Sequence, residues 1–364
     1  MLRIAIIGTR GIPNFHGGFE QFAEYISQYL ANHGFSVFVY CSRLHPYRES
    51  QWKDVRLVHC KDPEDRIGTA GQFVYDLNCI WHARKSNYDL ILQLGYTSSS
   101  VWGWLLPRKP VIVTNMDGLE WKRSKYSKKV RVFLKYAEKL AIKYSDYLVA
   151  DSLGIQSYLM EEYQVNSDYI PYGARVFSDP NALVLEKYNL NKYAYNLLIA
   201  RLEPENNIVT ILDGVVASNS NQPFLVIGKH QTKYGSYLKK RYKDFEKIRF
   251  LGGIYHLDDL NNLRYWSNLY FHGHSVGGTN PSLLEAMASS GLIIAHDNVF
   301  NRSILGTDAL YFKSDAEVTS YLSLKKEDYR EYLNRNLEKI RKEFNWEQIN
   351  SKYMELIKKV TATE

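Results

Sequence analysis

Short apolar runs alternate with amphipathic runs from the first residues of the chain. Leu2–Gly8 is a β-rich apolar run, Glu20–His33 places apolar side chains three and four positions apart, and Ser36–Tyr40 is apolar again. Apolar runs of about four to eight residues are typical of buried strands, and the longer spacing is typical of a helix with one packed face. The pattern therefore predicts a β-α-β unit at the start of the chain.

The alternation continues to about residue 150 and begins again near residue 196. Further strands are expected at 55–59, 90–94, 111–114 and 147–150, and then at 197–200, 223–227, 248–251, 269–272 and 292–295. In the second series, helices are expected at 207–218, 235–246, 257–265 and 281–289, and two more at 325–344 and 346–360. Helices between strands favour parallel sheets covered on both faces. Segment 170–179, with Pro171 and Gly173 inside it and Pro180 directly after it, is the expected connection between two doubly wound domains.

Length and composition agree with this interpretation. At roughly 150 residues per domain, 364 residues suit two domains, and 45% apolar with 23% charged residues excludes a disordered, collagen-like or multi-span membrane chain. No apolar stretch reaches the roughly 18 residues of a spanning helix, and Leu2–Gly8 lacks the features of a signal peptide, so we expect a cytoplasmic protein. Cys41, Cys60 and Cys79 have neither zinc-site nor disulfide spacing and are expected to be core thiols.

Basic residues are concentrated in one segment. The net charge is +7, and nine Lys or Arg residues between 122 and 143 face a single acid, Glu138. The segment predicts one strongly positive helix with interleaved aromatic residues, which suits an anionic lipid surface. A solvated helix face in a basic protein is the alternative. The residues expected to face a membrane are Trp121, Lys122, Arg123, Lys125, Lys128 and Lys129.

Glycine loops surround the start of the first helix. Gly8–Pro13 follows the first strand, and Gly17-Gly18 precedes Glu20 and the helix. Glycines at a strand-to-helix turn let backbone N–H groups approach a phosphate or another anion. The spacing is not G-x-G-x-x-G and the second strand ends without an acid for a ribose, which disfavours a dinucleotide-dependent dehydrogenase. A tight loop with a purely structural role is the other interpretation.

Two later strand ends carry further candidates. Asn115, Asp117 and Glu120 follow the strand at 111–114 and so belong to the carboxyl edge of the sheet, where open α/β folds bind ligands. Asp117 is the better candidate because Gly118 follows it, whereas Glu120 could simply start a helix; for Asp117 the alternative is a helix N-cap.

The strand at 269–272 runs into the densest motif of the chain. Gly277 and Gly278 lie in the loop after this strand, and Pro281 opens a helix at a position where its missing N–H costs nothing. Free N–H groups in such a loop would hold a diphosphate. Glu285 falls in the second helical turn, within reach of a ribose or sugar hydroxyl.

Together these motifs resemble the family 4 glycosyltransferases, retaining enzymes of the GT-B class. The resemblance covers nearly the whole chain. Residues 17–20 look like the family's G-G-x-E loop, 200–205 like its G-R-L-x-x-E-K segment, 281–288 like its L-E-A-M-A helix and 344–346 like its closing F-x-W. T-R-G-I-P at 9–13, D-G-L-E-W-K-R at 117–123 and the motif at 272–281 are similar to the rhamnosyltransferase-like subgroup, whose members build bacterial surface polysaccharides.

The resemblance implies a GT-B fold, with two Rossmann-like doubly wound domains that face a cleft. It implies an acceptor-binding domain at 1–174, a donor-binding domain at 175–340 and a helix at 341–364 that packs back on the first domain. The implied catalytic residues are Asp117 and Arg201. The implied donor-binding residues are Arg201, Lys229, Gly277, Gly278, Thr279, Asn280 and Glu285, and the acceptor-binding residues are Gly17, Gly18, Glu20, Asn115 and Glu120.

The implied reaction transfers a sugar from a nucleoside diphosphate, with deoxythymidine-diphosphate rhamnose favoured. The acceptor would be a saccharide on undecaprenyl diphosphate at the inner membrane surface, with no cofactor, metal or nucleic acid involved. Two positions depart from the family: Gly277 replaces the first glutamate of a pair, and Asn206 replaces the diphosphate lysine. The family's catalytic histidine is also not evident at Asn115-Met116-Asp117. A nucleotide-sugar epimerase and a catalytically silent sugar- or lipid-binding protein are the alternatives.

Overall fold

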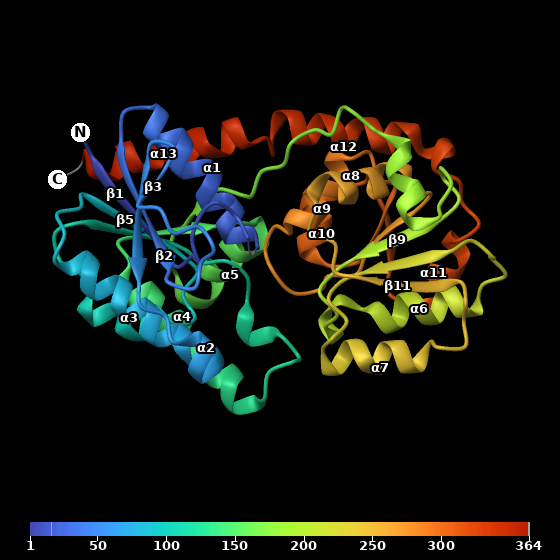
Figure 1. The fold of residues 1–364 in the computed structure, drawn as a ribbon, viewed down its shortest axis with the longest axis horizontal. Helices are drawn as coiled ribbons and strands as arrows, with labels where there is room; N and C mark the ends of the chain where they lie inside the picture. The colour runs from blue at the N-terminus through green and yellow to red at the C-terminus, as the bar shows by residue number, and fades with distance from the viewer. Residues whose placement is uncertain (16, 363–364) are drawn as a thin grey trace. The chain divides into compact units, whose positions relative to one another are not determined.

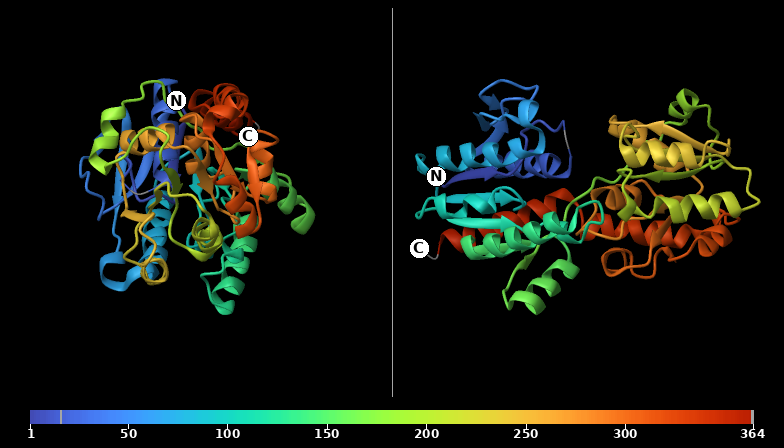
Figure 2. Two further views of the ribbon diagram at one scale, coloured as in Figure 1. Left: turned by 90° about the vertical axis from the view of Figure 1, so that its right-hand side faces the viewer. Right: turned by 90° about the horizontal axis from the view of Figure 1, so that it is seen from below.

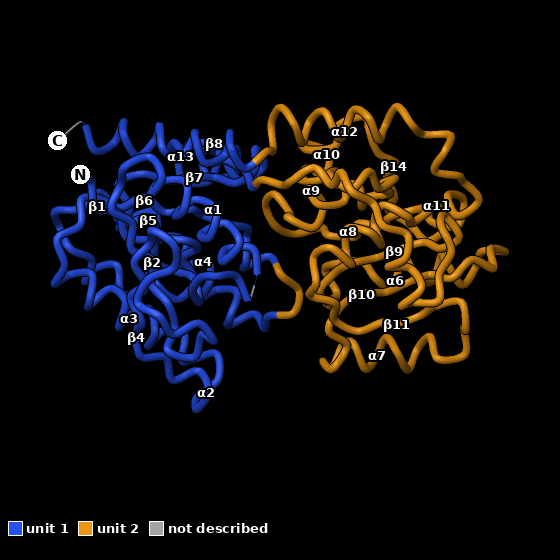
Figure 3. Tube along the Cα trace, turned by 45° about the horizontal axis from the view of Figure 1, so that its top comes forward, with its two compact units in different colours: residues 1–122, 126–172, 346–364 blue, residues 123–125, 173–345 orange. Residues whose placement is uncertain are grey.

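The computed structural model describes residues 1–15 and 17–362, which form two compact units (Figure 3). Unit 1 contains residues 1–122, 126–172 and 346 onward, and unit 2 contains residues 123–125 and 173–345. The chain therefore passes into unit 2 after residue 172, where the sequence predicted 174, and leaves it after residue 345, where the sequence predicted 340. The assignment of 123–125 to unit 2 was not predicted.

Unit 1 is built on an eight-stranded sheet in the order β3-β4-β2-β1-β5-β6-β7-β8, of which Figure 1 labels β1, β2, β3 and β5. The strands are β1 (Arg3–Ile7), β2 (Ser36–Ser42), β3 (Gln51–Trp52), β4 (Val55–Cys60), β5 (Leu90–Leu94), β6 (Val111–Asn115), β7 (Tyr147–Ala150) and β8 (Asp168–Tyr169). All neighbours pair in parallel except β3 with β4, and Ile4 lies between Val37 and Leu90. Because helices cover both faces, the central strands are apolar at successive positions.

The helices of unit 1 include the C-terminal one. They are α1 (Gly18–Asn32), α2 (Glu64–Ile67), α3 (Gly71–Arg84), α4 (Lys128–Tyr144), α5 (Leu153–Tyr163) and α13 (Trp346–Thr361). Trp346 stacks on Tyr25 with ring centroids 4.4 Å apart, and Tyr353 packs on Phe22 at 4.8 Å, so α13 lies against α1. The start of β1 and the end of α13 lie at the same end of the unit (Figures 1 and 2). The predicted return of the last helix to the N-terminal domain is confirmed.

Unit 2 repeats the architecture with six parallel strands in the order β11-β10-β9-β12-β13-β14. The strands are β9 (Asn196–Ile199), β10 (Phe224–Ile227), β11 (Ile248–Gly252), β12 (Tyr270–His272), β13 (Ile293–His296) and β14 (Leu310–Phe312). The helices are α6 (Ile208–Ala217), α7 (Lys233–Arg241), α8 (Leu257–Trp266), α9 (Pro281–Ala288), α10 (Val299–Leu305), α11 (Asp315–Tyr321) and α12 (Arg330–Lys342). Leu198, Phe224 and Phe271 lie in its fully buried core.

The strand order of each sheet reverses at one point. In unit 1, β1 leads to β2 on one side while β5 pairs with its other side; in unit 2, β9 leads to β10 while β12 pairs with its other side. Open α/β sheets bind ligands beyond the carboxyl ends of the strands at such switch points. A ligand site is therefore expected after β1 and β5, and another after β9 and β12.

The basic helix differs from its prediction. Helix α4 begins at Lys128, where the side chain of Ser127 accepts a hydrogen bond from the Val130 N–H, and residues 120–122 form a separate 3₁₀ turn. A single helix from residue 122 is thus wrong, because the capping serine starts the helix six residues later. Within the described residues, no helix has the length and apolarity needed to cross a membrane. Cys41, Cys60 and Cys79 are buried free thiols, as predicted.

Candidate functional site

A cavity of about 240 Å³ lies at the switch point of unit 1. Its lining includes Gly8, Thr9 and Arg10 after β1, Leu94–Ser99 after β5, Phe19 and Glu20 from α1, Gln72, Tyr75 and Asp76 from α3, and Asp117 and Glu120 after β6. The structure thus brings together three acids that the sequence proposed, Glu20, Asp117 and Glu120. It adds a fourth, Asp76, that the sequence analysis missed.

The turn after β6 is shaped by Asn115. This side chain is 2% exposed, donates a hydrogen bond from Nδ2 to the Tyr353 hydroxyl at 2.9 Å, and accepts the Asp117 N–H on Oδ1 at 2.9 Å. The polar atoms of Asn115 hold α13 and the turn, and its acceptor-binding role stays a prediction. Asp117 has a left-handed backbone with φ of 48°, which aspartate tolerates better than most residues. The cap of α4 is Ser127, so Asp117 does not fill that role.

Arg10 is neutralised beside the cavity. Its guanidinium donates to Asp62 at 2.9 Å and pairs with Glu64 at 2.6 Å, while its backbone N–H donates to Glu20 Oε1 at 2.8 Å. Gly17 and Gly18 lead into α1 but are not among the described residues that line this cavity. Their acceptor-binding role stays a prediction.

Asp76 is a buried carboxyl group on α3. It is 7% exposed, and the Ser98 hydroxyl donates to its Oδ2 at 2.5 Å. Burial raises the pKa of Asp76 to about 6, although the Ser98 hydrogen bond and the charge of Arg10 oppose the shift. Its neighbours on the same helix face are the buried Tyr75, Cys79 and Ile80. An acid at a core position of an amphipathic helix was the sequence signal that could have revealed it.

Two loops are tied together at the switch point of unit 2. Arg201 follows β9 and is exposed, and the Gly277-Gly278 loop follows β12 and is half-buried. Ser275 donates from its N–H and its hydroxyl to the Glu205 carbonyl at 3.2 and 2.7 Å. Asn207 Nδ2 donates to the Gly273 carbonyl at 2.8 Å. The predicted cation and the predicted amide loop thus flank adjacent strand ends.

The two positions that differ from the resembled family have structural explanations. Asn206 is 3% exposed and donates from Nδ2 to the Arg201 carbonyl at 2.7 Å, so it braces the arginine segment. Gly277 has φ of 136°, a conformation that L side chains rarely adopt. A glutamate at this position would be strained even though open space surrounds it.

Several predicted donor ligands have structural partners. Thr279 is 3% exposed, so the loop buries its side chain, and its role as a donor ligand stays a prediction. Asn280 caps α9 by accepting the Ser282 N–H, and Glu285 Oε2 accepts from the buried Arg264 at 2.6 Å. Asn280 and Glu285 have further polar atoms that could bind the donor, and Lys229 is exposed. Donor binding by these three residues stays a prediction.

Two histidines beside the loop are uncharged. The rings of His272 and His274 stack with centroids 4.3 Å apart. Burial lowers the pKa of His272 to about 3. Burial also holds the pKa of His274 well below its ordinary value, and His272, Arg201 and Arg123 add to the effect. His274 is therefore a neutral imidazole close to Arg201, a feature that sequence patterning did not indicate.

Three residues expected to face a membrane instead bind carboxylates. The Trp121 indole N–H donates to Glu138 at 3.2 Å. Arg123 lies 3.6 Å from Glu205, and Lys125 lies 3.6 Å from Glu203, within unit 2. These contacts engage the polar atoms of Trp121, Arg123 and Lys125, and their membrane-facing role stays a prediction. Lys122, Lys128 and Lys129 are exposed.

The exposed side of α4 remains basic and partly apolar. Val132 is 64% exposed and Tyr136 56%. Helical spacing places them on one stripe with exposed lysines, and we call this stripe the α4 face; it consists of Lys128, Lys129, Val132, Tyr136, Lys139 and Lys143. Mixed basic and apolar stripes of this kind are typical of helices that lie on lipid surfaces.

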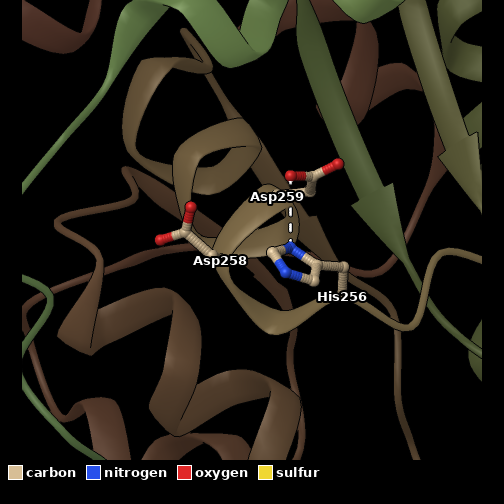
Figure 4. Close-up of side chains that lie close together, drawn as sticks. All are labelled: His256, Asp258 and Asp259. Atoms are coloured by element: carbon tan, nitrogen blue, oxygen red, sulfur yellow. Dashed lines mark ion pairs between the residues drawn. The ribbon is translucent and has the colours of Figure 1, made fainter.

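An acidic group with one histidine lies at the start of α8. Figure 4 shows His256 turned toward Asp259, 3.3 Å from it, with Asp258 beside them. Asp259 also accepts from Lys187 at 3.0 Å and from the Tyr188 hydroxyl at 3.0 Å. Ion pairs and hydrogen bonds already engage both oxygens of Asp259, and they account for this cluster.

One protein-family model matches part of the chain. A model described as a domain of unknown function, DUF1972, matches residues 1–93 and 109–175. These residues cover most of unit 1 and none of the unit 2 strands. No curated protein sequence matches the chain.

Comparison with solved structures covers the entire chain. A sucrose-phosphate synthase from Thermosynechococcus elongatus matches with a TM-score of 0.84 and 18% identity over 100% of both chains. HepE from Anabaena, in complex with UDP-glucose, matches with a TM-score of 0.75 and 13% sequence identity. The match covers 99% of this chain and 100% of the HepE chain. The protein has the GT-B fold. An α,α-trehalose-phosphate synthase (UDP-forming) from Burkholderia vietnamiensis also matches, with a TM-score of 0.72 and 13% sequence identity. That match covers 99% of this chain and 100% of the other chain. The predicted fold class is confirmed, while membership of family 4 stays a prediction.

Proposed function

We propose that this GT-B protein is a glycosyltransferase that moves a sugar from a nucleoside diphosphate donor to a saccharide acceptor. The observation that carries the proposal is the contrast between its two switch points. Unit 1 offers a cavity lined by carboxylates, and unit 2 offers Arg201 beside a glycine loop. The HepE structure on the same fold contains UDP-glucose, a donor of the proposed class.

The unit 2 site suits the leaving diphosphate. Negative charge grows on that group as the glycosidic bond breaks, so a cation and backbone N–H groups aimed at it lower the barrier. Asn206 holds the Arg201 carbonyl and Ser275 holds the start of the loop, so the backbone of both segments is fixed before the reaction. Lys229, exposed after β10, supplies a further cation.

The favoured donor is deoxythymidine-diphosphate rhamnose. Support comes from Gly277, which leaves no side chain where the resembling family places a glutamate on the transferred sugar, and this suits a deoxy sugar. Transfer proceeds with retention of configuration and without a divalent cation, as in the family that the motifs resemble. Proton NMR of the anomeric product checks the first point, and unchanged activity in EDTA checks the second.

The favoured acceptor is a saccharide carried on undecaprenyl diphosphate during synthesis of a bacterial surface polysaccharide. Support comes from the α4 face, whose four lysines, Val132 and Tyr136 suit the cytoplasmic face of an anionic membrane. Asp117 at the unit 1 cavity orients the acceptor hydroxyl or assists its deprotonation.

The test is an assay with a panel of nucleoside diphosphate sugars and lipid-linked saccharides. We expect a product that requires both substrates, and a loss of about 10²- to 10³-fold in kcat for Arg201→Ala, the size seen when a charge-stabilising donor is removed. Lys240→Ala, an exposed change on α7, is the matched control and keeps its activity. An altered sugar nucleotide formed without acceptor identifies an epimerase instead, and binding without turnover identifies a silent binding protein.

A further inference from the structure

We infer that the unit 1 cavity binds an uncharged saccharide unit and rejects anionic sugars, and that Asp76 is the residue that makes this selection. The inference rests on the proposed function, because it names the acceptor chemistry of that same reaction. For a lipid-linked acceptor, it places only the neutral sugar in the cavity. The negatively charged diphosphate of the lipid carrier stays outside, because the cavity is lined mainly by acids.

The charges around the cavity exclude a second anion. Among its described lining residues, four are acids and one is a base. The acids are Glu20, Asp76, Asp117 and Glu120, and the base is Arg10. Arg10 is already paired with Asp62 and Glu64, so its charge is compensated. A uronate would meet like charges in a partly desolvated space, whereas sugar hydroxyls are neutral donors that carboxylates accept.

Asp76 presents one oxygen to the cavity. Ser98 holds Oδ2, and no hydrogen bond to Oδ1 is found among the described residues. We place Oδ1 on the cavity side, because Asp76 lines the cavity and Ser98 already engages Oδ2. A carboxylate that is fixed on one side and open on the other accepts a hydrogen bond from one defined hydroxyl.

Size and lining agree with a single sugar ring. The cavity of about 240 Å³ is smaller than the roughly 300–1,000 Å³ of pockets for drug-sized ligands. The half-buried Phe19 offers aromatic surface for the apolar face of a ring, and the half-buried Gln72 offers a further polar group, while the nearly buried Tyr75 and Tyr96 complete the aromatic lining. A few polar groups among aromatic walls are typical of small-molecule sites.

The experiment compares matched neutral and anionic glycosides as competitors of transfer. The probes are methyl glucoside against methyl glucuronide, and methyl galactoside against methyl galacturonide. For the wild-type protein, we expect at least one neutral glycoside to compete at least tenfold better than its uronide. In Asp76→Asn, we expect that ratio to move toward one. Asp65→Asn is the matched control, because it removes an exposed charge on α2 outside the cavity and keeps the ratio.

The outcomes separate the two proposals. A protein that binds no nucleoside diphosphate contradicts the proposed function itself. A protein that binds nucleoside diphosphate but accepts uronides as well as neutral glycosides, or shows no competition by either, contradicts the inference alone. An unchanged ratio in Asp76→Asn removes Asp76 from the selection. If that variant does not fold, Ser98→Ala, which frees the Asp76 carboxyl group, is the second variant and must also lower the ratio.

Discussion

The two sheets share a topology and differ in the charge at their switch points. In unit 1 the strand ends meet around Asp76, Asp117 and two further acids. In unit 2 they meet around Arg201, a glycine loop and the neutral His274. Under the proposed function, this comparison means that the strand order decides where a ligand binds, whereas the loop side chains decide which ligand charge is accepted.

Removing the Asp117 charge has the largest expected effect on this comparison. Asp117→Asn keeps the size of the side chain but cannot accept a proton, so we expect kcat to fall by about 10²- to 10⁴-fold. Affinity for nucleoside diphosphate stays unchanged, because that ligand is assigned to unit 2. Steady-state kinetics and calorimetry measure the two effects. Turnover close to that of the wild type removes Asp117 from the mechanism.

Removing the Asp76 charge is expected to stabilise the fold. Its folded-state pKa of about 6 lies above the ordinary 3.8, so the folded protein loses stability as pH rises from about 4 through 6. The Arg10 charge and Asp62 face the same group and are part of this balance. At pH 7.5, Asp76→Asn should therefore gain up to roughly 3 kcal/mol, at about 1.4 kcal/mol per pKa unit.

Denaturant unfolding of both proteins at pH 4 and pH 7.5 measures this gain. We expect the difference in the free energy of unfolding between variant and wild type to grow from the lower to the higher pH. If the difference in the free energy of unfolding is the same at pH 4 and pH 7.5, burial does not destabilise the charged form of the Asp76 carboxyl group. A stabilising substitution that also alters sugar selection is the signature of a residue kept for binding.

Neutralising part of the α4 face has a smaller expected effect. Each of Lys128→Gln and Lys129→Gln removes about 1 kcal/mol of attraction to an anionic membrane. For the double variant, we therefore expect membrane partitioning to fall by roughly 30-fold. Sedimentation with phosphatidylglycerol vesicles measures it, and high salt should abolish the difference. The matched control is Lys239→Gln with Lys240→Gln, two exposed lysines on α7. Equal binding by the two double variants contradicts a membrane role for the α4 face.

Much of the fold could be predicted because it follows from local pattern. The long buried strands β1, β2 and β5 are continuous apolar runs, and helix α9 begins at the proline that the sequence identified. Strands β3, β8 and β14 were missed, and each is only two or three residues long, too short for a periodic pattern of its own. The equally short β12 was predicted because the glycine-rich loop marks its end. The start of α4 was misplaced because lysines and arginines are spaced in the same way before and after the cap residue Ser127. The basic pattern alone therefore does not mark where the helix begins.

The positions of the candidate side chains were predictable only where a strand end or a helix start fixes them. Asp117 and Glu120 follow β6, Glu20 lies at the start of α1, and all three line one cavity. Asp76 comes from the middle of a helix, so its place depends on how α3 packs. The pairs formed by Glu285 with Arg264 and by Arg123 with Glu205 depend on contacts between residues far apart in the sequence. Local pattern contains no information about such partners.

The central claim is that the anionic donor binds unit 2 and the uncharged acceptor binds unit 1. Calorimetry of UDP and deoxythymidine diphosphate with the wild type, Arg201→Ala and Asp76→Asn tests it most directly. We predict that Arg201→Ala weakens binding of the accepted nucleotide by about 10- to 100-fold, as expected for a charged hydrogen bond of roughly 1.5–3 kcal/mol, and that Asp76→Asn leaves the affinity unchanged. Unchanged affinity in Arg201→Ala together with a loss in Asp76→Asn would contradict the account.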